Sequence, residues 1–400
     1  MKIGIIREGK IPSDSRVVLG PEQCRRLIGQ GVDLVVQKSN VRCFTDEEYH
    51  NAGVPLVTEL IDRDILLGVK EVPIEMLVDG KKYFFFSHTI KQQAYNQPLL
   101  RAVIDKKITL LDYEVLTDER GARVIAFGKF AGMVGAHNAL WTYGRRTGDF
   151  ILSRMHEFFN YDAAKKQYAK LSIPNIKIVL TGTGRVANGA AQVLRDMGIE
   201  KVRPIDYVTK KYEKPVFTQL HSFYYAKRKD GKEFDGVQDF YNNPADYESD
   251  FDHFLPMTDI MINGIYWDNN APVFFTTEQM KKKDFGIKVI SDVTCDIAPV
   301  SSIPSTLRAS TIPDPVFGFD PLTGKEVPPF TSNTVDMMTI DNLPNEMPRD
   351  ASMAFGEMFI GHVLPELKLE ESQMLNLATI TVNGQLGPHF QYLKEYLEGK

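Results

Sequence analysis

One segment limits the fold of this chain more than any other: NIKIVLTGTGRVANGAAQVL, residues 175–194. An apolar run, a glycine turn and an amphipathic segment follow one another, which predicts a strand, a tight turn and a helix. Gly182 permits the turn, Gly184 lets the backbone approach a pyrophosphate, and Ala187 allows close helix packing, while the helix N-terminus offers N–H groups to phosphates. The segment therefore predicts dinucleotide binding. The predicted contact residues are Gly182, Gly184, Arg185 and Val186.

The next acidic residue indicates which dinucleotide binds. The segment KVRPID places Asp206 24 residues after Gly182, near the spacing of about 20 residues at which a carboxylate binds the adenosine ribose. We expect Asp206 to end the following strand and to favour NAD, because a carboxylate repels a 2′-phosphate. Lys210 and Lys211 lie close in sequence and leave NADP open, and Pro204 interrupts the strand pattern. The alternative is an aspartate that only contacts solvent.

Apolar runs and amphipathic segments alternate along the first third of the chain, which is typical of a parallel α/β sheet. The segments KIGIIR, PEQCRRLIGQG and VDLVVQ predict strand, helix and strand. More strands are expected at 65–69, 83–86 and 108–111, and a helix is expected around 99–104. A stretch without proline from Phe130 to about Phe159 predicts one long or two consecutive helices, where the chain crosses to a second domain.

The second domain repeats the pattern, with strands expected at 176–181, 259–263 and 288–291. The segment Phe217–Leu255 is interpreted as a polar, irregular insertion and Ala298–Pro329 as loops, whereas Ala351–Leu367 is helical in pattern and the remaining tail is expected to fold back on the first domain. The sequence thus predicts an α/β protein of two Rossmann-like, doubly wound domains with an inter-domain cleft. The boundaries are 1–130 plus 345–400 for a discontinuous substrate domain and 131–344 for the dinucleotide-binding domain.

Composition excludes several classes of function. The net charge of −5 comes from interspersed acids and bases, without the basic patch that nucleic-acid binding needs. The three cysteines form neither a disulfide framework nor a CxxC metal site, so no metal is expected. The charged N-terminus is not a secretory signal and no apolar stretch is long enough to span a membrane, so we expect a cytoplasmic protein that binds small molecules, and homo-oligomerisation stays open.

Charged residues follow the predicted strands of the first domain. Parallel strands bind ligands beyond their carboxyl ends, so these residues are expected to line one cleft. Each one alone is more often only the place where a strand meets water. The residues concerned are Arg7 and Glu8, Lys70 and Glu71, His88, and Glu114, with Asp292 and Asp296 following a strand of the second domain.

This set suits hydride chemistry at a carbon that bears nitrogen. The cofactor carries the hydride, while the protein moves protons and holds carboxylates. Histidine titrates near neutral pH, which makes His88 the natural proton carrier, and Lys70 becomes an acid or base if burial lowers its pKa. Arg16 and Lys91 are suitable carboxylate anchors. Alternatively, Arg16 and Lys91 are only solvated cations on the surface, as most arginine and lysine residues are.

Several longer segments resemble one known family. They are GVKEVP, YFFFSHTIKQQAYNQPLL, LLDYEVLTDERGARVIAFGKFAG, VLTGTGRVANGA, INGIYWDNNAP, SDVTCD and TIDNLP, which together span nearly the whole chain. They resemble the lysine-forming saccharopine dehydrogenases and, more closely, the lysine–2-oxoglutarate reductase domain of the bifunctional lysine-degrading enzyme. Both belong to the alanine dehydrogenase and transhydrogenase superfamily.

The resemblance implies the reversible conversion of saccharopine, NAD(P)⁺ and water into lysine, 2-oxoglutarate and NAD(P)H. It implies Lys70 and His88 as catalytic acid–base groups. The substrate-binding residues that we predict are Arg16, Glu71, Lys91, Glu114, Asp292 and Asp296, and Tyr266 and Asp206 are added to the predicted cofactor contacts. The insertion resembles that of the reductase domain, which generally uses NADP, whereas Asp206 resembles the NAD-using fungal type. The chain ends at Lys400, so we expect no second dehydrogenase domain.

Two alternative functions stay open at this point. One is an alanine-dehydrogenase-like or other imino-acid reductase that acts on a smaller substrate. The other is a nucleotide sensor that kept the fold and lost the chemistry. The presence of Lys70, His88 and Arg16 argues against the sensor.

Overall fold

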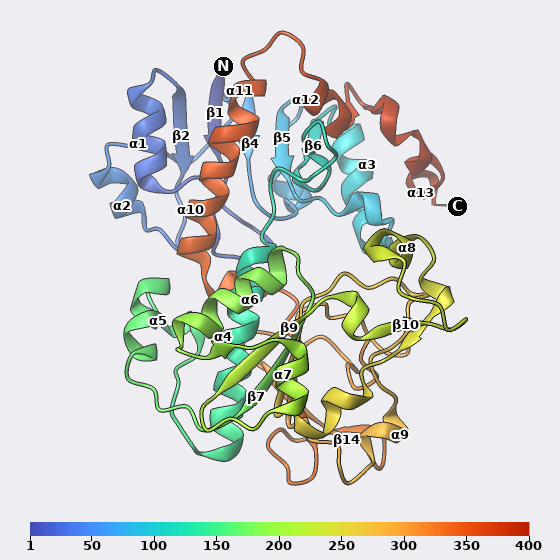
Figure 1. Cartoon of the computed structure of the whole chain (residues 1–400). Coiled ribbons are helices and arrows are strands. Elements are labelled where there is room, and N and C mark those ends of the chain that lie inside the picture. Colours follow the sequence, from blue (N-terminus) through green and yellow to red (C-terminus); the bar gives the residue numbers. More distant parts are fainter. Residues whose placement is uncertain (400) are drawn as a thin grey trace. The chain divides into compact units, whose positions relative to one another are not determined.

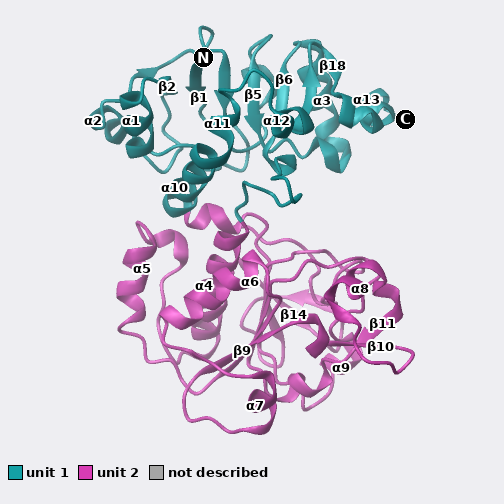
Figure 2. Cartoon of the chain, turned by 45° about the horizontal axis from the view of Figure 1, so that its top comes forward, with its two compact units in different colours: residues 1–127, 348–400 teal, residues 128–347 magenta. Residues whose placement is uncertain are grey.

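The computed structural model describes residues 1–399 and divides the chain into two compact units. The first unit combines residues 1–127 with residues 348–400, and the second unit is continuous, residues 128–347 (Figure 2). Both units are α/β, so the predicted fold class is confirmed at this level. The two sheets are mixed but mainly parallel.

The first unit is built on an eight-stranded sheet in the order β18-β17-β6-β5-β4-β1-β2-β3 (Figure 1). Its strands are β1 (Lys2–Ile5), β2 (Asp33–Gln37), β3 (Leu56–Val57), β4 (Ile65–Leu67), β5 (Lys82–Phe85), β6 (Thr109–Asp112), β17 (Thr379–Val382) and β18 (Gln385–Leu386). Its α-helices are α1 (Pro21–Gly29), α2 (Asp46–Asn51), α3 (Gln97–Asp105), α10 (Pro348–Met358), α11 (Leu364–Glu366), α12 (Gln373–Ala378) and α13 (Lys394–Glu398). The prediction that the tail folds back on this domain is confirmed, because β17 pairs antiparallel with β6.

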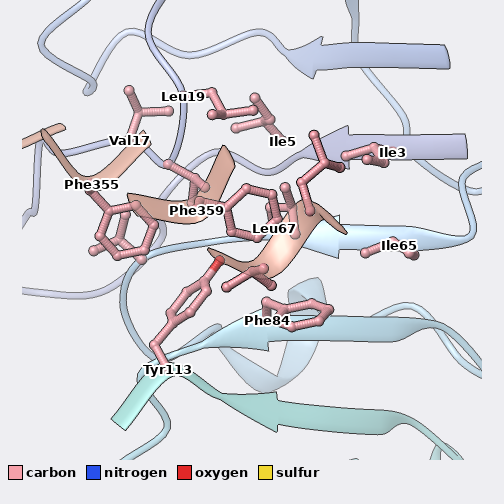
Figure 3. Close-up of a cluster of buried hydrophobic side chains, with 14 of the residues drawn as sticks. Ile3, Ile5, Val17, Leu19, Ile65, Leu67, Phe84, Tyr113, Phe355 and Phe359 are labelled. Atoms are coloured by element: carbon pink, nitrogen blue, oxygen red, sulfur yellow. The ribbon is translucent and has the colours of Figure 1, made fainter. Parts of the chain in front are cut away.

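Apolar residues on alternate sides of the strands create a core on each face of this sheet. On β5, Phe84 belongs to the core beneath α10, while Tyr83 and Phe85 belong to the core beneath α3. Figure 3 shows the first of these cores, in which Phe355 and Phe359 of the C-terminal segment lie beside residues of β1 and β4. Two segments at opposite ends of the sequence therefore share one apolar core, which explains why the unit is discontinuous.

The second unit contains an eight-stranded sheet in the order β15-β14-β16-β13-β12-β7-β9-β8 and a small hairpin of β10 and β11. Its strands are β7 (Lys177–Thr181), β8 (Glu200–Lys201), β9 (Val216–Leu220), β10 (Ala226–Arg228), β11 (Tyr247–Ser249), β12 (Ile260–Asn263), β13 (Val289–Asp292), β14 (Val316–Asp320), β15 (Lys325–Val327) and β16 (Val335–Met338). Its α-helices are α4 (Gly128–Thr147), α5 (Tyr161–Tyr168), α6 (Arg185–Asp196), α7 (Pro204–Thr209), α8 (Gly236–Asn242) and α9 (Thr277–Met280).

Helices α4 and α6 pack very closely, because glycine removes the side chain at their contact. A Cβ added to Gly132 of α4 would lie 1.8 Å from the carbonyl oxygen of Val186, and one added to Gly189 of α6 would lie 2.0 Å from that of Lys129. This contact fixes the first turn of α6, and hence the glycine turn before it.

The prediction of one long helix after Phe130 is confirmed by α4, but the predicted extent to about Phe159 is wrong, since α4 ends at Thr147 and Gly148 adopts a left-handed conformation with φ +76°. Two other sequence predictions for the second unit are wrong. The supposed insertion at Phe217–Leu255 begins inside β9, a strand next to β7. The supposed loops at Ala298–Pro329 contain β14 and β15, which pair antiparallel.

Candidate functional site

The carboxyl ends of four parallel neighbours, β1, β4, β5 and β6, lie along one edge of the first sheet. Strand β1 has β2 on one side and β4 on the other, so the strand order reverses beside it. Open α/β sheets bind ligands beyond the carboxyl ends of the strands at such a reversal. Glu8 follows β1, Lys70 follows β4, His88 follows β5 and Glu114 follows β6. The structure therefore brings the predicted charges of the first unit to this edge.

Lys70 is the cation at the centre of the set. Its ammonium forms no hydrogen bond or ion pair with any other residue between 1 and 399. Burial is the main cause that lowers its pKa, and the nearby guanidinium of Arg16 lowers it further, while Glu71 and Asp14 act in the opposite direction. A lysine with a lowered pKa exchanges protons more readily near neutral pH.

Glu71 connects His88 to Lys10. Its carboxylate lies 2.5 Å from Nδ1 of His88 through one oxygen and accepts a hydrogen bond of 2.6 Å from Nζ of Lys10 through the other. Burial opposes ionisation of Glu71, but these two partners outweigh it and lower its pKa to about 2. A carboxylate on one ring nitrogen fixes the orientation of an imidazole. The other ring nitrogen of His88 is the one left to exchange protons.

Arg16 lies beside Lys70 and is almost fully buried. Its Nε and Nη2 donate to the two oxygens of Asp14 at 2.9 and 2.5 Å, and its guanidinium lies 4.3 Å from the centre of the Phe127 ring. This two-point contact holds the guanidinium rigidly. We predicted that the guanidinium of Arg16 binds a substrate carboxylate, but two of its nitrogens already donate to Asp14.

Glu114 lies between two half-exposed cations. Its Oε1 accepts a hydrogen bond of 3.0 Å from Arg123 and lies 3.6 Å from Nζ of Lys91. Its Oε2 is buried and has no hydrogen-bond partner in the described chain. A buried carboxylate oxygen without a partner is costly. It is therefore a natural acceptor for an ammonium group of a ligand.

Glu8 holds the backbone of the site. Its two oxygens accept hydrogen bonds from the N–H groups of Val69 and Lys70 at 2.7 and 2.9 Å. Burial raises the pKa of Glu8 to about 7, against the lowering effect of these two donors. Glu8 thus ties the end of β1 to the end of β4 directly beside Lys70.

In the second unit, the glycine turn has the geometry that a dinucleotide needs. Gly182 adopts φ +94°, and a Cβ there would lie 2.6 Å from the carbonyl oxygen of Gly264. A Cβ on Gly184 would meet nothing within 4 Å, so the space in front of the first turn of α6 is open. Arg185 is exposed at the start of α6, and Val186 packs near Gly128 and Gly264. These features fit a bound pyrophosphate.

Asp206 is not at the end of a strand, so that part of the prediction is wrong. Strand β8 ends at Lys201, and Pro204 begins α7, whose first turn carries Asp206. Its carboxylate pairs with Arg203 and Lys210 at 2.7 and 3.0 Å, and these hydrogen bonds lower its pKa to about 2. Moreover, the strand next to β7 is β9 and not β8.

The other predicted residues of the second unit lie at the carboxyl ends of β12 and β13. Tyr266 is 79% exposed in the loop after β12. Asp292 is fully buried and accepts hydrogen bonds from Asn263 and Thr306 at 2.9 and 2.6 Å, so its carboxylate is occupied by the chain. Asp296 is partly buried, and burial, with the charge of Asp292, raises its pKa to about 6.

Three residues of the first cluster were not predicted as site residues: Lys10, Asp14 and Arg123. Glu8 was expected to line the cleft because it follows the first strand, but its role in holding the backbone was not predicted. Lys10 and Asp14 lie in an irregular segment, and Arg123 reaches Glu114 through the antiparallel bridge between Thr117 and Arg123. Contacts of this kind follow no regular spacing in the sequence, so a sequence pattern does not predict them.

Comparison with known proteins shows that the chain is homologous to dehydrogenases that act on amino acids. Residues 4–134 match the family model "Alanine dehydrogenase/PNT, N-terminal domain". The mouse protein "Alpha-aminoadipic semialdehyde synthase, mitochondrial" is 30% identical over 97% of this chain, which spans only 47% of that protein. The "Saccharopine dehydrogenase [NAD(+), L-lysine-forming]" of Emericella nidulans is 29% identical over 93% of both chains. A solved "L-alanine dehydrogenase" has 16% identity and a TM-score of 0.66 over 99% of this chain and 100% of its own.

The first 134 residues thus include an alanine dehydrogenase/PNT N-terminal domain, and the fold is that of alanine dehydrogenase. Over nearly its whole length the chain is homologous to the lysine-forming saccharopine dehydrogenases and the alpha-aminoadipic semialdehyde synthases, at 29% and 30% identity to the two relatives named above. The resemblance predicted from the sequence is confirmed. The chain spans less than half the length of the semialdehyde synthases that it matches.

Two further findings concern the described part of the chain. None of its helices has the length and apolar character needed to cross a bilayer. No group of three or more histidine, cysteine, aspartate or glutamate side chains between residues 1 and 399 is arranged to hold a metal ion.

Proposed function

We propose that this protein catalyses the reversible, pyridine-nucleotide-dependent formation of saccharopine. In the reductive direction, lysine, 2-oxoglutarate, NAD(P)H and a proton give saccharopine, NAD(P)⁺ and water. The observation that carries the proposal is the cluster at the edge of the first sheet, where an unpaired Lys70 ammonium lies among Arg16, Glu71 and His88. The family relationship supports the same reaction.

The substrates explain the charges of the cluster. Saccharopine carries three carboxylates and two amino groups, so its site needs several cations and at least one acceptor for an ammonium. Lys91 and Arg123, about half-exposed, are suited to bind carboxylates, and the partnerless Oε2 of Glu114 between them is suited to bind an ammonium. Arg16, held by Asp14, acts mainly on Lys70 by lowering its pKa.

The chemistry requires two kinds of proton transfer. The ε-amino group of lysine must lose a proton before its nitrogen attacks the keto carbon of 2-oxoglutarate, and the carbonyl oxygen must gain protons to leave as water. We assign these transfers to Lys70 and to His88, whose orientation is fixed by Glu71. A nicotinamide cofactor, when bound, supplies the hydride that reduces the resulting imine. The glycine turn at Gly182 and Gly184 is the proposed place for its pyrophosphate.

The test is a substrate panel with the full chain. Purified protein with NADH or NADPH is supplied with lysine plus 2-oxoglutarate, or with pyruvate plus ammonium, and cofactor oxidation is followed by absorbance. We expect turnover with the first pair. Turnover only with the second pair would support an alanine-dehydrogenase-like enzyme, and cofactor binding without turnover on either pair would support a sensor.

A variant pair connects the activity to the cluster. Lys70→Met should reduce turnover by about 10²–10⁴-fold, because it removes an acid–base group. Lys81→Met is the matched control, since the ammonium of Lys81, before the start of β5, donates only to the backbone oxygen of Ile61. Full activity of Lys70→Met would contradict the proposed role. We also expect a cytoplasmic enzyme, although the mouse relative is named as mitochondrial.

A further inference from the structure

A buried carboxylate lies between the two strand ends that lead to His88 and Glu114. Asp112 is the last residue of β6 and is level with Phe85, the last residue of β5 (Figure 1). It is fully buried. A carboxylate in such a place is costly unless N–H and O–H groups donate to it, so its donors indicate what it does.

Three donors reach Asp112, and each belongs to a residue that lies beyond the strands. The N–H and the hydroxyl of Ser87 donate to Oδ2 at 2.8 and 2.6 Å. The N–H of Glu114 donates to Oδ1 at 2.7 Å. One carboxylate therefore holds both the residue directly before His88 and the backbone of Glu114.

The hydroxyl of Ser87 connects Asp112 to the residue after His88. Its one hydrogen is used by Asp112, so the hydroxyl of Thr89, whose oxygen lies 2.8 Å away, donates to it. The N–H of Thr89 donates to the same oxygen at 3.3 Å. Ser87 and Thr89 are both fully buried. The backbone is thus held on both sides of His88 by groups that depend on Asp112.

His88 itself has a backbone conformation that needs such support. Its φ of +54° lies in the left-handed region, which residues other than glycine adopt at a cost. Strain of this kind persists only where the surrounding structure fixes it. The left-handed turn sets the direction in which the imidazole leaves the backbone, and in this direction Nδ1 lies 2.5 Å from a carboxylate oxygen of Glu71.

A purely structural alternative is that Asp112 only fastens β5 to β6. The two strands are already paired in parallel along their whole length. None of the three hydrogen bonds at Asp112 belongs to that ladder, since the donors are Ser87 and Glu114. An apolar residue would complete the pairing without the cost of a buried charge. The contacts therefore favour a role in placing the two site residues.

We propose that Asp112, acting in part through Ser87, is a positioning residue for His88 and Glu114. It holds the turn that directs the imidazole and the backbone that carries the Glu114 carboxylate. The inference rests on the proposed function, because that function makes His88 a proton carrier and Glu114 an acceptor for an ammonium. It adds the residues that keep these two groups in place.

The first test is Ser87→Ala, which removes the hydroxyl and leaves both backbone donors to Asp112. With lysine, 2-oxoglutarate and NADH or NADPH, kcat should fall about tenfold, because a small displacement of an acid–base group slows proton transfer. The KM for lysine should stay within about twofold, since the N–H of Glu114 still donates to Asp112.

Ser87→Ala is then combined with His88→Ala. If Ser87 acts through His88, adding Ser87→Ala should change the residual kcat of His88→Ala by less than about twofold, because substitutions that remove one shared function are not additive. An equal loss in both backgrounds would show that Ser87 acts on the protein as a whole and would overturn the proposal.

A spectroscopic measurement follows His88 without any substrate. In protein whose histidine rings carry carbon-13, the NMR signal that is absent from His88→Ala belongs to His88. Ser87→Ala should shift this signal and leave those of the other histidines unchanged, because it loosens the turn on which His88 lies.

The matched control is Thr381→Val. Thr381 is also fully buried, and its hydroxyl donates to the carbonyl oxygen of Ile108 at 2.9 Å, at the amino end of β6 and away from the site. This variant loses a buried hydroxyl as Ser87→Ala does. It should change neither kcat nor the signal of His88.

A second variant, Asp112→Asn, tests the carboxylate itself. The amide keeps the shape of the side chain but turns an N–H toward the donors of Ser87 or of Glu114. The value of kcat/KM for lysine should therefore fall at least about tenfold. A normal kcat/KM would overturn the proposal, and so would Ser87→Ala with a normal kcat and an unshifted His88 signal.

The two proposals can fail separately. If the wild type does not turn over lysine and 2-oxoglutarate, the proposed reaction is removed, and the signal of His88 alone decides whether Ser87 positions it. If the wild type turns them over, but the losses in Ser87→Ala and His88→Ala are additive and the signal is unshifted, the reaction stands and the positioning role is overturned.

Discussion

Replacing Glu8 by glutamine should change how the stability of the first unit depends on pH. Burial raises the pKa of the Glu8 carboxyl from 4.5 to about 7. Below about pH 4.5 the group is protonated in the folded and unfolded chain, so it has no effect on the balance between them. Between these values only the unfolded chain loses the proton, so stability falls as pH rises. At 1.36 kcal/mol per pKa unit, Glu8 should remove about 3 kcal/mol of unfolding free energy by about pH 7.

The Glu8→Gln variant does not titrate, so its curve should lack this fall. Glutamine keeps one acceptor oxygen but turns an amide N–H toward one of the two backbone donors at Val69 and Lys70. The lost hydrogen bond costs about 1 kcal/mol at every pH. The variant should therefore be less stable than the wild type by about 1 kcal/mol near pH 4.5 and more stable by about 2 kcal/mol near pH 8.

Urea unfolding at several pH values measures this difference. Both tryptophans of the sequence, Trp141 and Trp267, lie in the second unit, so their fluorescence follows that unit, while far-UV circular dichroism follows both. Only the dichroism transition should respond to Glu8→Gln. Glu22→Gln, at an exposed carboxylate paired with Arg25, is the control and should leave both unchanged. Parallel pH curves for wild type and Glu8→Gln would refute the reasoning.

Two other variants test the assigned roles in the proposed reaction. His88→Ala should reduce turnover with lysine and 2-oxoglutarate by about 10²–10⁴-fold with little change in the unfolding transition, and a near-normal rate would assign His88 a structural role only. Glu114→Gln should raise the KM for lysine about tenfold and change kcat much less, because it removes the negative charge opposite an ammonium group; an unchanged KM in initial-rate measurements would exclude Glu114 from the lysine site.

The sequence predicted the elements with strong local patterns. Strands β1, β4, β5 and β7 are short apolar runs with clear boundaries, and α1 begins at Pro21, where proline fits the first helical turn. The glycine turn was predictable because its residues are contiguous. The cluster was partly predictable because each charge directly follows an apolar strand, and parallel strands bring their carboxyl ends together.

The errors arose where pairing partners, and not local sequence, decide the structure. Strand β9 reads VFTQL, and its polar Thr218 and Gln219 interrupt the apolar run that a buried strand usually shows, so its place between β7 and β8 is known only from the pairing in the structure. Because β9 has no signal in the sequence, the next strand in the chain, β8, was taken as the neighbour of β7. Asp206 was therefore predicted to end the neighbouring strand and to bind the ribose. Pro204 already argued against a strand that continues to Asp206. Strand β8 ends at Lys201, five residues before Asp206, and Pro204 begins α7.

The balance of charges at the edge of the first sheet supports the proposal that Lys70 is the acid–base group of the site. Asp14 is held by Arg16, Glu71 by Lys10 and His88, and one oxygen of Glu114 by Arg123, so these acids already have partners inside the chain. Glu8 is held by two N–H groups, and its raised pKa makes it a poor source of negative charge for Lys70 near neutral pH. A buried ammonium without a carboxylate partner loses its proton more easily than an ordinary lysine. In the proposed reaction, the arrival of a substrate carboxylate would supply the missing charge and raise the pKa of Lys70, so Lys70 would act as a base before binding and as an acid after it.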